Sequence, residues 1–279
     1  MSEELTRVAV EAVQRAGKTL RQRFRDDSLK VHSKAEHDFV TEADHDSEAV
    51  IIDHLQKQFP SHLILSEEAG LVGPEGADHQ WIIDPLDGTG NFLKGLPVWS
   101  VSIACRKQSR LESAVVYDPL GDNLFTATAG SGAWWNGDRM RVSKLAGIEG
   151  AFLATGFPFR ARGALGVYLQ LFEQVFLKAR GIRRCGSAAL DLAYTAAGVF
   201  DGFFEFRLSP WDIAAGDLLI REAGGVVTDL DGGDGYLTAG NVVSGSPAVH
   251  AALREVIQKY SSEDLLDDLA PVEKVSLAS

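Results

Sequence analysis

The chain has 279 residues, of which 45% are hydrophobic and 24% charged, a balance typical of a soluble globular protein with one or two compact units. Acidic residues number 39 and basic residues 27, and the net charge of −12 argues against a general nucleic-acid or anionic-membrane surface. The sequence contains neither a run of 18 apolar residues nor a signal-peptide pattern, so we expect no membrane segment and a cytoplasmic location.

Two helices are predicted near the start of the chain. Apolar residues at three- and four-residue spacings predict an amphipathic helix over 3–25 that packs on a sheet. Thr41 and Asp44 have the hydroxyl and acid spacing of a helix start, so a second helix is predicted from there to Pro60.

Strand patterns follow the second helix. Short apolar runs predict two strands, and each run leads directly into acidic residues. Alternating β-forming residues then predict an antiparallel stretch, in which an Asn-Gly pair marks a hairpin. These features lie at 62–65, 80–83, 98–105, 111–117, 123–129 and 136–137.

From residue 151 the pattern changes to an alternation of helices and strands. The predicted elements are a strand from 151, helices over 166–179 and 188–197, a strand over 199–206, a helix over 210–223 and a strand over 226–230. We divide the chain into halves at 1–150 and 151–260 and an acidic tail at 261–279, predicted to be disordered. Because no linker separates the halves, we expect them to share one continuous core.

The strongest local signal is an apolar strand that ends in two aspartates. The run Trp81-Ile-Ile-Asp84 delivers Asp84 to a strand end, and Pro85 with Asp87-Gly88 indicates that the chain turns there. A straight strand would place the two aspartates on opposite faces, so we expect the turn to make them converge. The alternative is an ordinary turn at Asp87 and a loop residue at Asp84.

Residues 88–90 would expose backbone N–H groups and one hydroxyl beside these carboxylates, which suits a phosphoryl group. Two carboxylates and a phosphate dianion need counter-charge, which one or more Mg²⁺ ions would supply. The segment therefore predicts a magnesium-dependent phosphate site.

Four further acids are candidates with strong structural alternatives. Glu67 and Glu68 follow an apolar run, but such a pair also opens helices or faces water. Asp44 and Asp212 each lie three residues after a hydroxyl residue, so helix capping alone would explain both. An acid at a helix N-terminus is also placed where a metal or water could meet it, so the two interpretations are compatible.

Six segments follow one another along the chain: Asp38-Phe-Val-Thr-Glu-Ala-Asp44, Ser66-Glu67-Glu68, Trp81-Ile-Ile-Asp-Pro-Leu-Asp-Gly-Thr89, Gly186-Ser-Ala-Ala189, Trp211-Asp-Ile-Ala-Ala-Gly-Asp217 and Glu222-Ala-Gly-Gly225. Taken together in this order, they resemble the inositol monophosphatase family over residues 5 to about 258. The resemblance implies an α/β (α+β) fold, the layered αβαβα sandwich of the inositol monophosphatase and fructose-1,6-bisphosphatase type, and a homodimer.

The resemblance also implies a set of metal ligands. Glu67, Asp84 and the backbone carbonyl of Leu86 would bind one Mg²⁺, and Asp84, Asp87 and Asp212 would bind a second. Asp84 would bridge the two ions, and a third, weaker Mg²⁺ would lie near Glu67. The family further implies inhibition by lithium at one of these sites.

The residues that would act on the substrate follow from the same resemblance. Asp44 and Thr89 would orient and deprotonate a metal-activated water for in-line attack on phosphorus, so the implied catalytic set is Asp44, Thr89 and Glu67. The residues implied to contact the substrate are Asp87, Gly88, Thr89, Ala188, Glu205 and Asp212. Glu205 lies between aromatic residues in a predicted strand, where a polyol hydroxyl would give it a polar partner; alternatively it is an ordinary solvent-facing residue.

The chain departs from the family pattern at two positions. Gly90 stands where the family usually has Thr or Asn, which removes a side chain beside the phosphate loop but leaves the N–H. Ser66 stands where the family often has Gly, which should not disturb Glu67. Neither change removes a catalytic group.

These observations predict a Mg²⁺-dependent phosphoric monoester hydrolase that converts a small polyol phosphate, inositol 1-phosphate, into inositol and phosphate. Histidinol phosphate, fructose 1,6-bisphosphate and 3'(2'),5'-bisphosphate nucleotides are alternative substrates on the same scaffold, and the metal-site residues do not separate them. A non-catalytic regulatory protein that retains the fold is a further alternative, against which the intact set of acids argues. No nucleic-acid or membrane partner is indicated.

Overall fold

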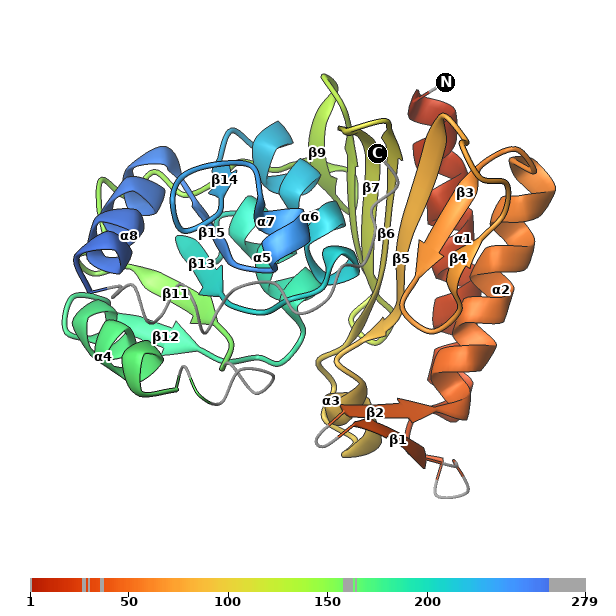
Figure 1. Cartoon of the computed structure of the whole chain (residues 1–279), viewed down its shortest axis with the longest axis horizontal. Coiled ribbons are helices and arrows are strands. Elements are labelled where there is room, and N and C mark those ends of the chain that lie inside the picture. Colours follow the sequence, from red (N-terminus) through yellow and green to blue (C-terminus); the bar gives the residue numbers. More distant parts are fainter. Residues whose placement is uncertain are drawn as a thin grey trace.

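The computed structural model describes residues 2–26, 29, 31–35, 38–157, 163 and 165–260, and within them the chain stacks five alternating layers (Figure 1). An eight-stranded and a five-stranded sheet separate three helical layers, which confirms the αβαβα sandwich. The predicted tail at 261–279 lies outside the described residues. The helical layers are α1 (Ser2–Arg23) with α2 (Glu42–Gln58), α5 (Ala188–Ala196) with α6 (Pro210–Glu222), and α4 (Leu165–Phe176) with α8 (Pro247–Tyr260).

The eight-stranded sheet confirms the predicted antiparallel stretch. All neighbouring strands are antiparallel except the pair β3 and β5. The hairpin at Asn136-Gly137 is confirmed as well, since both residues have positive φ, at 49° and 89°. In spatial order the strands are β10 (Asp138–Arg139), β9 (Gly132–Trp135), β8 (Asn123–Thr128), β7 (Arg110–Asp118), β6 (Ser100–Lys107), β5 (His79–Asp87), β3 (Leu63–Ser66) and β4 (Gly70–Val72).

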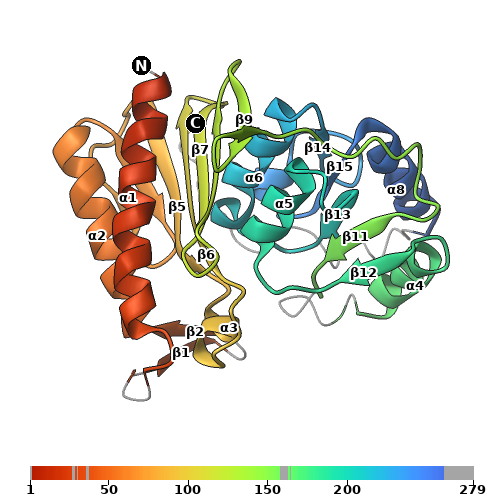
Figure 2. The ribbon, with the colours of Figure 1, turned by 180° about the vertical axis from the view of Figure 1, so that it is seen from behind.

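Helices α1 and α2 cover the outer face of this sheet (Figure 2). Both were predicted, and the second begins where its capping pattern places it: the Asp44 carboxylate accepts a hydrogen bond from the backbone N–H of Thr41 at 2.9 Å. A small two-stranded sheet of β1 (Val31–Ala35) and β2 (Asp38–Thr41) connects the two helices. These two short strands are not predicted from the sequence.

The five-stranded sheet and its helices confirm the type of each predicted element but not every boundary. Helix α4 ends at Phe176 rather than 179, because the chain then closes in turns. The strand predicted over 199–206 is shorter, because the N–H groups of Val199 and Phe200 both donate to the Tyr194 carbonyl at the end of α5. In spatial order the strands are β12 (Gly181–Arg183), β11 (Phe152–Thr155), β13 (Gly202–Glu205), β15 (Val242–Gly245) and β14 (Val226–Thr228).

Several elements were missed. The missed strands β4, β12 and β15 have only three or four residues and no flanking pattern that marks them as strands, and the helices α3 (Thr89–Leu93) and α7 (Tyr236–Ala239) are too short to show a helical period. Helix α8 was within reach of the sequence, because its buried residues recur at helical spacing: Val249, Leu253, Val256 and Ile257.

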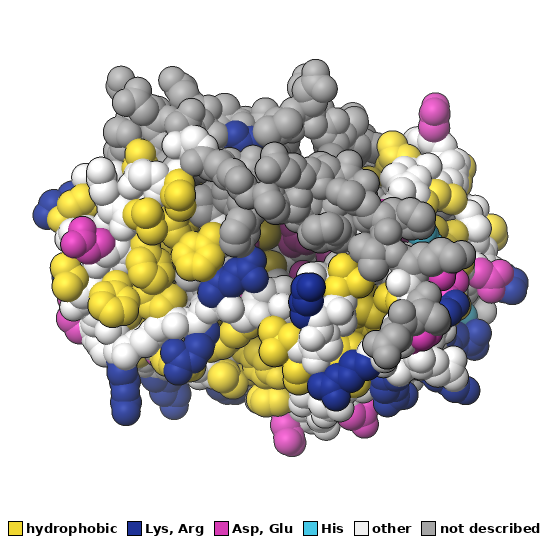
Figure 3. Space-filling model, turned by 90° about the horizontal axis from the view of Figure 1, so that it is seen from below, with side chains coloured by type: hydrophobic (Ala, Val, Ile, Leu, Met, Phe, Trp, Pro, Cys, Tyr) yellow, Lys and Arg dark blue, Asp and Glu magenta, His cyan; other side chains and the backbone are white. Residues whose placement is uncertain are grey.

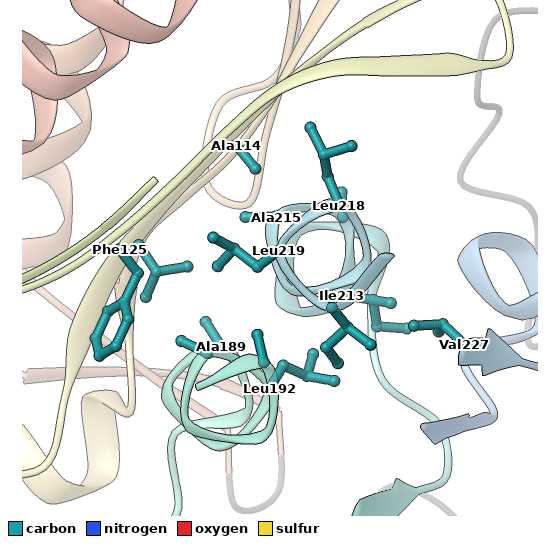
Figure 4. Packing of buried hydrophobic residues seen from close by; sticks show 14 of the residues in the cluster. Ala114, Phe125, Ala189, Leu192, Ile213, Ala215, Leu218, Leu219 and Val227 are labelled. Carbon is teal, nitrogen blue, oxygen red and sulfur yellow. The ribbon is translucent and has the colours of Figure 1, made fainter. Parts of the chain in front are cut away.

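The layer of α5 and α6 is buried between the two sheets. Figure 4 shows Leu192 of α5 and Leu219 of α6 packed among side chains such as Phe125 from the first sheet and Val227 from the second. This single cluster of buried residues draws on both halves of the chain. The boundary near residue 150 stays a prediction, and buried residues from both sides of it pack into the same core.

One outer surface carries exposed apolar side chains. Leu165, Leu169 and Phe176 of α4 are 44–58% exposed, and Leu177 just after it is 70% exposed. Apolar side chains gather at the left of Figure 3, the side on which α4 lies in Figure 1. The homodimer implied by the family resemblance stays a prediction, for which this row is a candidate contact surface. Within the described ranges, no helix has the length and apolar character needed to cross a membrane.

Candidate active site

A β-bulge brings Asp84 and Asp87 to the same face of the first sheet. On β6, Asp84 pairs with Ser102 and Asp87 with Ser100, so a three-residue step on β5 lies opposite a two-residue step. Side chains alternate faces along a regular strand, and the extra residue cancels this alternation. The turn predicted here is absent from the structure: the strand continues to Asp87 and absorbs one extra residue between Asp84 and Asp87, where Pro85 cannot donate to the ladder.

The polar groups around the bulge find partners inside the protein. Ser47 of α2 donates its hydroxyl to the carbonyl of Pro85 at 2.7 Å. The Leu86 N–H donates to Asp84 Oδ1 at 3.0 Å, and the Thr89 hydroxyl reaches the Leu86 carbonyl at the same distance. These contacts hold the irregular backbone in one shape although it is buried.

Asp212 joins the two aspartates from the other half of the chain. It lies at the start of α6, where its carboxylate accepts a hydrogen bond from the Ser209 N–H at 2.6 Å, as the capping pattern predicts. One oxygen of each of Asp84, Asp87 and Asp212 lies within 4.8 Å of the others. Three buried carboxylates at this spacing fit a divalent cation that prefers oxygen ligands, such as Mg²⁺, Mn²⁺ or Ca²⁺.

Burial and mutual repulsion raise the pKa of these carboxyls. Burial is the main cause of the rise at Asp84, whose pKa lies well above its ordinary value, and the charges of Glu67, Asp87 and Asp212 add to it. The pKa of Asp87 rises to about 7 for the same reasons, against hydrogen bonds that favour its ionised form. Cation binding therefore competes with protons and should tighten as the pH rises through 7.

Asp87 is also bound by the N-terminus of α5. Its Oδ2 accepts the Ser187 hydroxyl at 2.5 Å and the Ala189 N–H at 2.8 Å. The N-terminal end of a helix carries a partial positive charge that stabilises an anion there. Since Asp87 belongs to the first sheet and α5 to the middle layer, this contact fixes the two halves of the site relative to each other.

Glu67 lies near the three aspartates but outside their close group. It follows β3, its backbone N–H donates to the Ile83 carbonyl at 3.2 Å, and its charge is the second cause of the raised Asp84 pKa. The side chain is partly exposed. Its assignment as a metal ligand, like that of the Leu86 carbonyl, stays a prediction.

The predicted pair of Asp44 and Thr89 is in contact. The Thr89 hydroxyl lies 3.0 Å from Asp44 Oδ1, and burial raises the pKa of Asp44 although hydrogen bonds from Thr41 and Thr89 oppose this rise. A carboxyl whose proton affinity is raised is a better proton acceptor at neutral pH. Thr89 and Gly90 open α3, so their N–H groups lack partners within the helix.

The remaining predicted contacts lie on the side of the second sheet. Ala188 begins α5 and is 8% exposed. Glu205 ends β13, and burial together with the charges of Asp191 and Asp212 raises its pKa well above the ordinary value, while Arg184 opposes the rise. The charges of Asp212 and Asp87 are among the causes of this rise, so Glu205 lies within electrostatic range of the carboxylate group. Its role toward a substrate stays a prediction.

The sequence analysis missed several residues that support the site. Asn91 donates its side-chain amide to the carbonyls of Val98 at 2.7 Å and Cys185 at 2.9 Å, which ties the loop after β5 to the loop before α5. Ser187 stands inside the motif Gly186–Ala189, and Asn91 follows the motif that ends at Thr89 by two residues, so both lie where the sequence already pointed to a site. Asp191 gave no signal, because its burial arises only in the folded chain.

Asp191 is a buried acid within α5. It is 1% exposed, Cys185 donates a hydrogen bond to it, and its Oδ1 has no hydrogen-bond partner among the residues that the structure describes. Burial raises its pKa to about 8, with a further contribution from the charge of Asp87 and opposition from Arg184. The folded protein therefore holds a proton here at a pH where the unfolded chain has lost it.

This proton gives a testable pH dependence. Between about pH 4 and 8 the folded state binds one more proton than the unfolded state, so the free energy of unfolding falls as the pH rises through that window. Asp191→Asn removes the titration and should gain stability relative to the wild type by on the order of 3 kcal/mol between pH 5.5 and 8.5. Urea unfolding in EDTA measures this difference, with exposed Asp53→Asn as control; parallel curves would contradict the assignment.

Comparisons with known proteins show the family and the fold of this chain. The model of the inositol monophosphatase family matches residues 1–262. Nus factor SuhB of Escherichia coli strain K12 is 49% identical over 247 residues, which cover 88% of this chain and 92% of that protein. Extragenic suppressor protein suhB from Bartonella henselae has a TM-score of 0.89 at 41% identity, covering 92% of this chain and 99% of that one. An inositol monophosphatase from Anabaena has a TM-score of 0.83 at 33% identity, covering 94% and 98%.

Proposed function

This chain belongs to the inositol monophosphatase family, and we propose that it is a Mg²⁺-dependent phosphomonoesterase whose substrate is inositol 1-phosphate. The observation that carries the proposal is the close group of Asp84, Asp87 and Asp212 beside the hydroxyl of Thr89. Bound Mg²⁺ would lower the pKa of the attacking water, neutralise the phosphate oxygens and stabilise the leaving alkoxide. Lithium would inhibit by occupying one of the cation positions.

Thr89 and Asp44 would move the proton. The Thr89 hydroxyl has one hydrogen and two acceptors at 3.0 Å, Asp44 Oδ1 and the Leu86 carbonyl. When this hydrogen points to Asp44, the Thr89 oxygen can accept a proton from water while Asp44 takes the proton that Thr89 releases. The raised pKa of Asp44 favours this transfer.

The phosphate would lie over the start of α3. Apart from its chain neighbours and the backbone of its own helix, no atom in the described ranges lies within 4 Å of the position that a Cβ on Gly90 would occupy, so this side of the loop has room for a ligand. The N–H groups of Thr89 and Gly90 would donate to phosphate oxygens. Glu205 and Ala188 would border the polyol, with the Glu205 carboxylate accepting hydrogen bonds from its hydroxyl groups.

A substrate panel tests the proposal. Phosphate release is measured from inositol 1-phosphate, histidinol phosphate, fructose 1,6-bisphosphate and a 3',5'-bisphosphate nucleotide, each with Mg²⁺ and with EDTA. We expect the highest kcat/KM for inositol 1-phosphate and no release in EDTA. Faster turnover of histidinol phosphate would overturn the substrate, and no release from any of the four with Mg²⁺ would overturn the enzyme class.

The relatives named Nus factor SuhB favour a second function beside the first. The name is that of a transcription-regulatory factor, and the similarity covers most of both chains. We propose that this chain also has a regulatory role and that this role does not require the acids of the active site. A catalytically inactive Asp87→Asn chain that restores regulation in cells lacking the gene would support this separation, and failure to restore it would contradict it.

A further inference from the structure

One buried face of helix α2 is polar where it meets the candidate active site. Its buried residues include Asp44, Ser47 and Glu48 in the first two turns, followed by Ile51 and Leu55 in the later turns. Positions three and four apart lie on the same side of a helix, so the three polar side chains and the two apolar ones form one continuous face. Polar groups on such a face need partners.

Each of the three polar residues contacts a different part of the site. Asp44 meets Thr89, and Ser47 meets the carbonyl of Pro85 in the bulge. Glu48, which is 6% exposed, reaches the turn after β3, the segment that carries Glu67. The first two contacts belong to the site described above, whereas nothing in the proposed chemistry uses Glu48.

Glu48 holds that turn through a single oxygen. Its Oε1 accepts the Ser66 hydroxyl at 2.5 Å, the Glu68 N–H at 3.1 Å and the Ala69 N–H at 2.9 Å. The residues before and after Glu67 are thus both bound to α2, and the Glu67 N–H is itself bound to the carbonyl of Ile83. The backbone on each side of Glu67 is therefore fixed relative to Asp84, the next residue along β5.

We propose that Glu48 is a positioning residue that, with Ser66, sets where the Glu67 carboxylate stands relative to Asp84. The inference rests on the proposed metal site, in which Glu67 is a ligand. Outer hydrogen bonds that orient a ligating carboxylate affect metal affinity by roughly 10–100-fold. Ser66 also gains a role: it stands where the family often has Gly, and its hydroxyl supplies one of the three donors.

The direct charge of Glu48 is the competing explanation, and the choice of variants separates the two. Glu48→Gln keeps an oxygen that can accept from the turn but removes the charge. Glu48→Ala removes both. Leu55→Ala, on the apolar part of the same face, is the matched control for lost packing, since it creates a cavity without touching the turn.

The test is the affinity for Mn²⁺, measured by electron paramagnetic resonance on the metal-free protein. The part of this affinity that Glu67→Gln loses is the share of binding that depends on Glu67. We expect Glu48→Ala to weaken that share roughly 10–100-fold, Glu48→Gln to stay within about threefold of the wild type, and Leu55→Ala to lower the melting temperature at unchanged affinity. If Glu48→Ala does not fold, Ser66→Ala takes its place, with an expected loss of about threefold to tenfold.

Each other outcome has a distinct meaning. Wild-type affinity in folded Glu48→Ala, or in Ser66→Ala where it replaces that variant, would overturn the proposal. An equal loss of Mn²⁺ affinity in Glu48→Gln and Glu48→Ala would also overturn it, because the charge of Glu48 rather than the position of Glu67 would then explain the loss. A wild-type chain that binds Mn²⁺ but releases no phosphate from the substrate panel would contradict the proposed function alone.

Discussion

Asp87→Asn should lower the rate of phosphate release by about 10²-fold or more while leaving the fold intact. The Asp87 carboxylate serves two neighbours. Its Oδ2 accepts hydrogen bonds from Ser187 and Ala189, and one of its oxygens belongs to the close group with Asp84 and Asp212. An asparagine can keep its oxygen toward α5, which turns its NH₂ group toward the other carboxylates. The site then loses one negative charge and presents a donor where a cation needs an acceptor.

Stability should move in the opposite direction to activity. Burial and the charge of Asp212 raise the Asp87 pKa to about 7, so the metal-free folded protein loses stability as the pH rises from about 4 to 7, and Asp87→Asn removes that loss. Steady-state phosphate release at pH 8 and thermal unfolding in EDTA measure the two effects. Asp138→Asn, at an exposed residue of β10, is the control. Near-normal activity in Asp87→Asn would sink the metal assignment.

Gly88→Ala should both destabilise the protein, by about 2–4 kcal/mol, and reduce activity strongly. Gly88 has a φ of +94°, and a Cβ there would stand 3.0 Å from the Val98 carbonyl oxygen and 3.1 Å from the Gly186 carbonyl oxygen. Both are backbone atoms, which cannot swing aside as a side chain would. The loop after β5 would have to move, and with it Thr89.

The neighbouring glycine provides a matched control for stability. Beyond its own helix, a Cβ on Gly90 meets nothing within 4 Å in the described part of the chain, and the residue lies within the short helix α3, where alanine is the better helix former. Urea unfolding should therefore show a loss at Gly88→Ala and little change or a small gain at Gly90→Ala. Equal losses in the two variants would show that the conformation of Gly88 is not the cause.

The sequence predicted those parts of the fold that depend on local rules. The starts of α2 and α6 follow from hydroxyl and acid spacing, and the hairpin at Asn136-Gly137 follows from the φ values that these residues tolerate. The convergence of Asp84 and Asp87 was also expected, but through a turn. The structure achieves it through a bulge, which depends on the register against β6 and is therefore not visible in β5 alone.

The parts that escaped prediction depend on contacts between distant segments. Ser187 and Asp87 are 100 residues apart, and Glu48 meets a turn about 20 residues away. Glu48 nevertheless had a signal that was passed over, because it lies four residues after Asp44 and three before Ile51, on the buried face of a helix. An acid in that position needs a partner, and a search for polar residues within apolar helix faces would have found it.

The amide of Asn91 links the loop after β5 to the carbonyl of Cys185, and this has a consequence for the order of events during folding. Asp84 and Asp87 come from the first sheet, whereas Ser187 and Asp212 come from helices that pack between both sheets. Neither half contains the complete group of acids, so catalysis should return only when the segments around Asn91 have docked. Recovery of activity would then report the last step of refolding, after the helices and strands of each half have already formed.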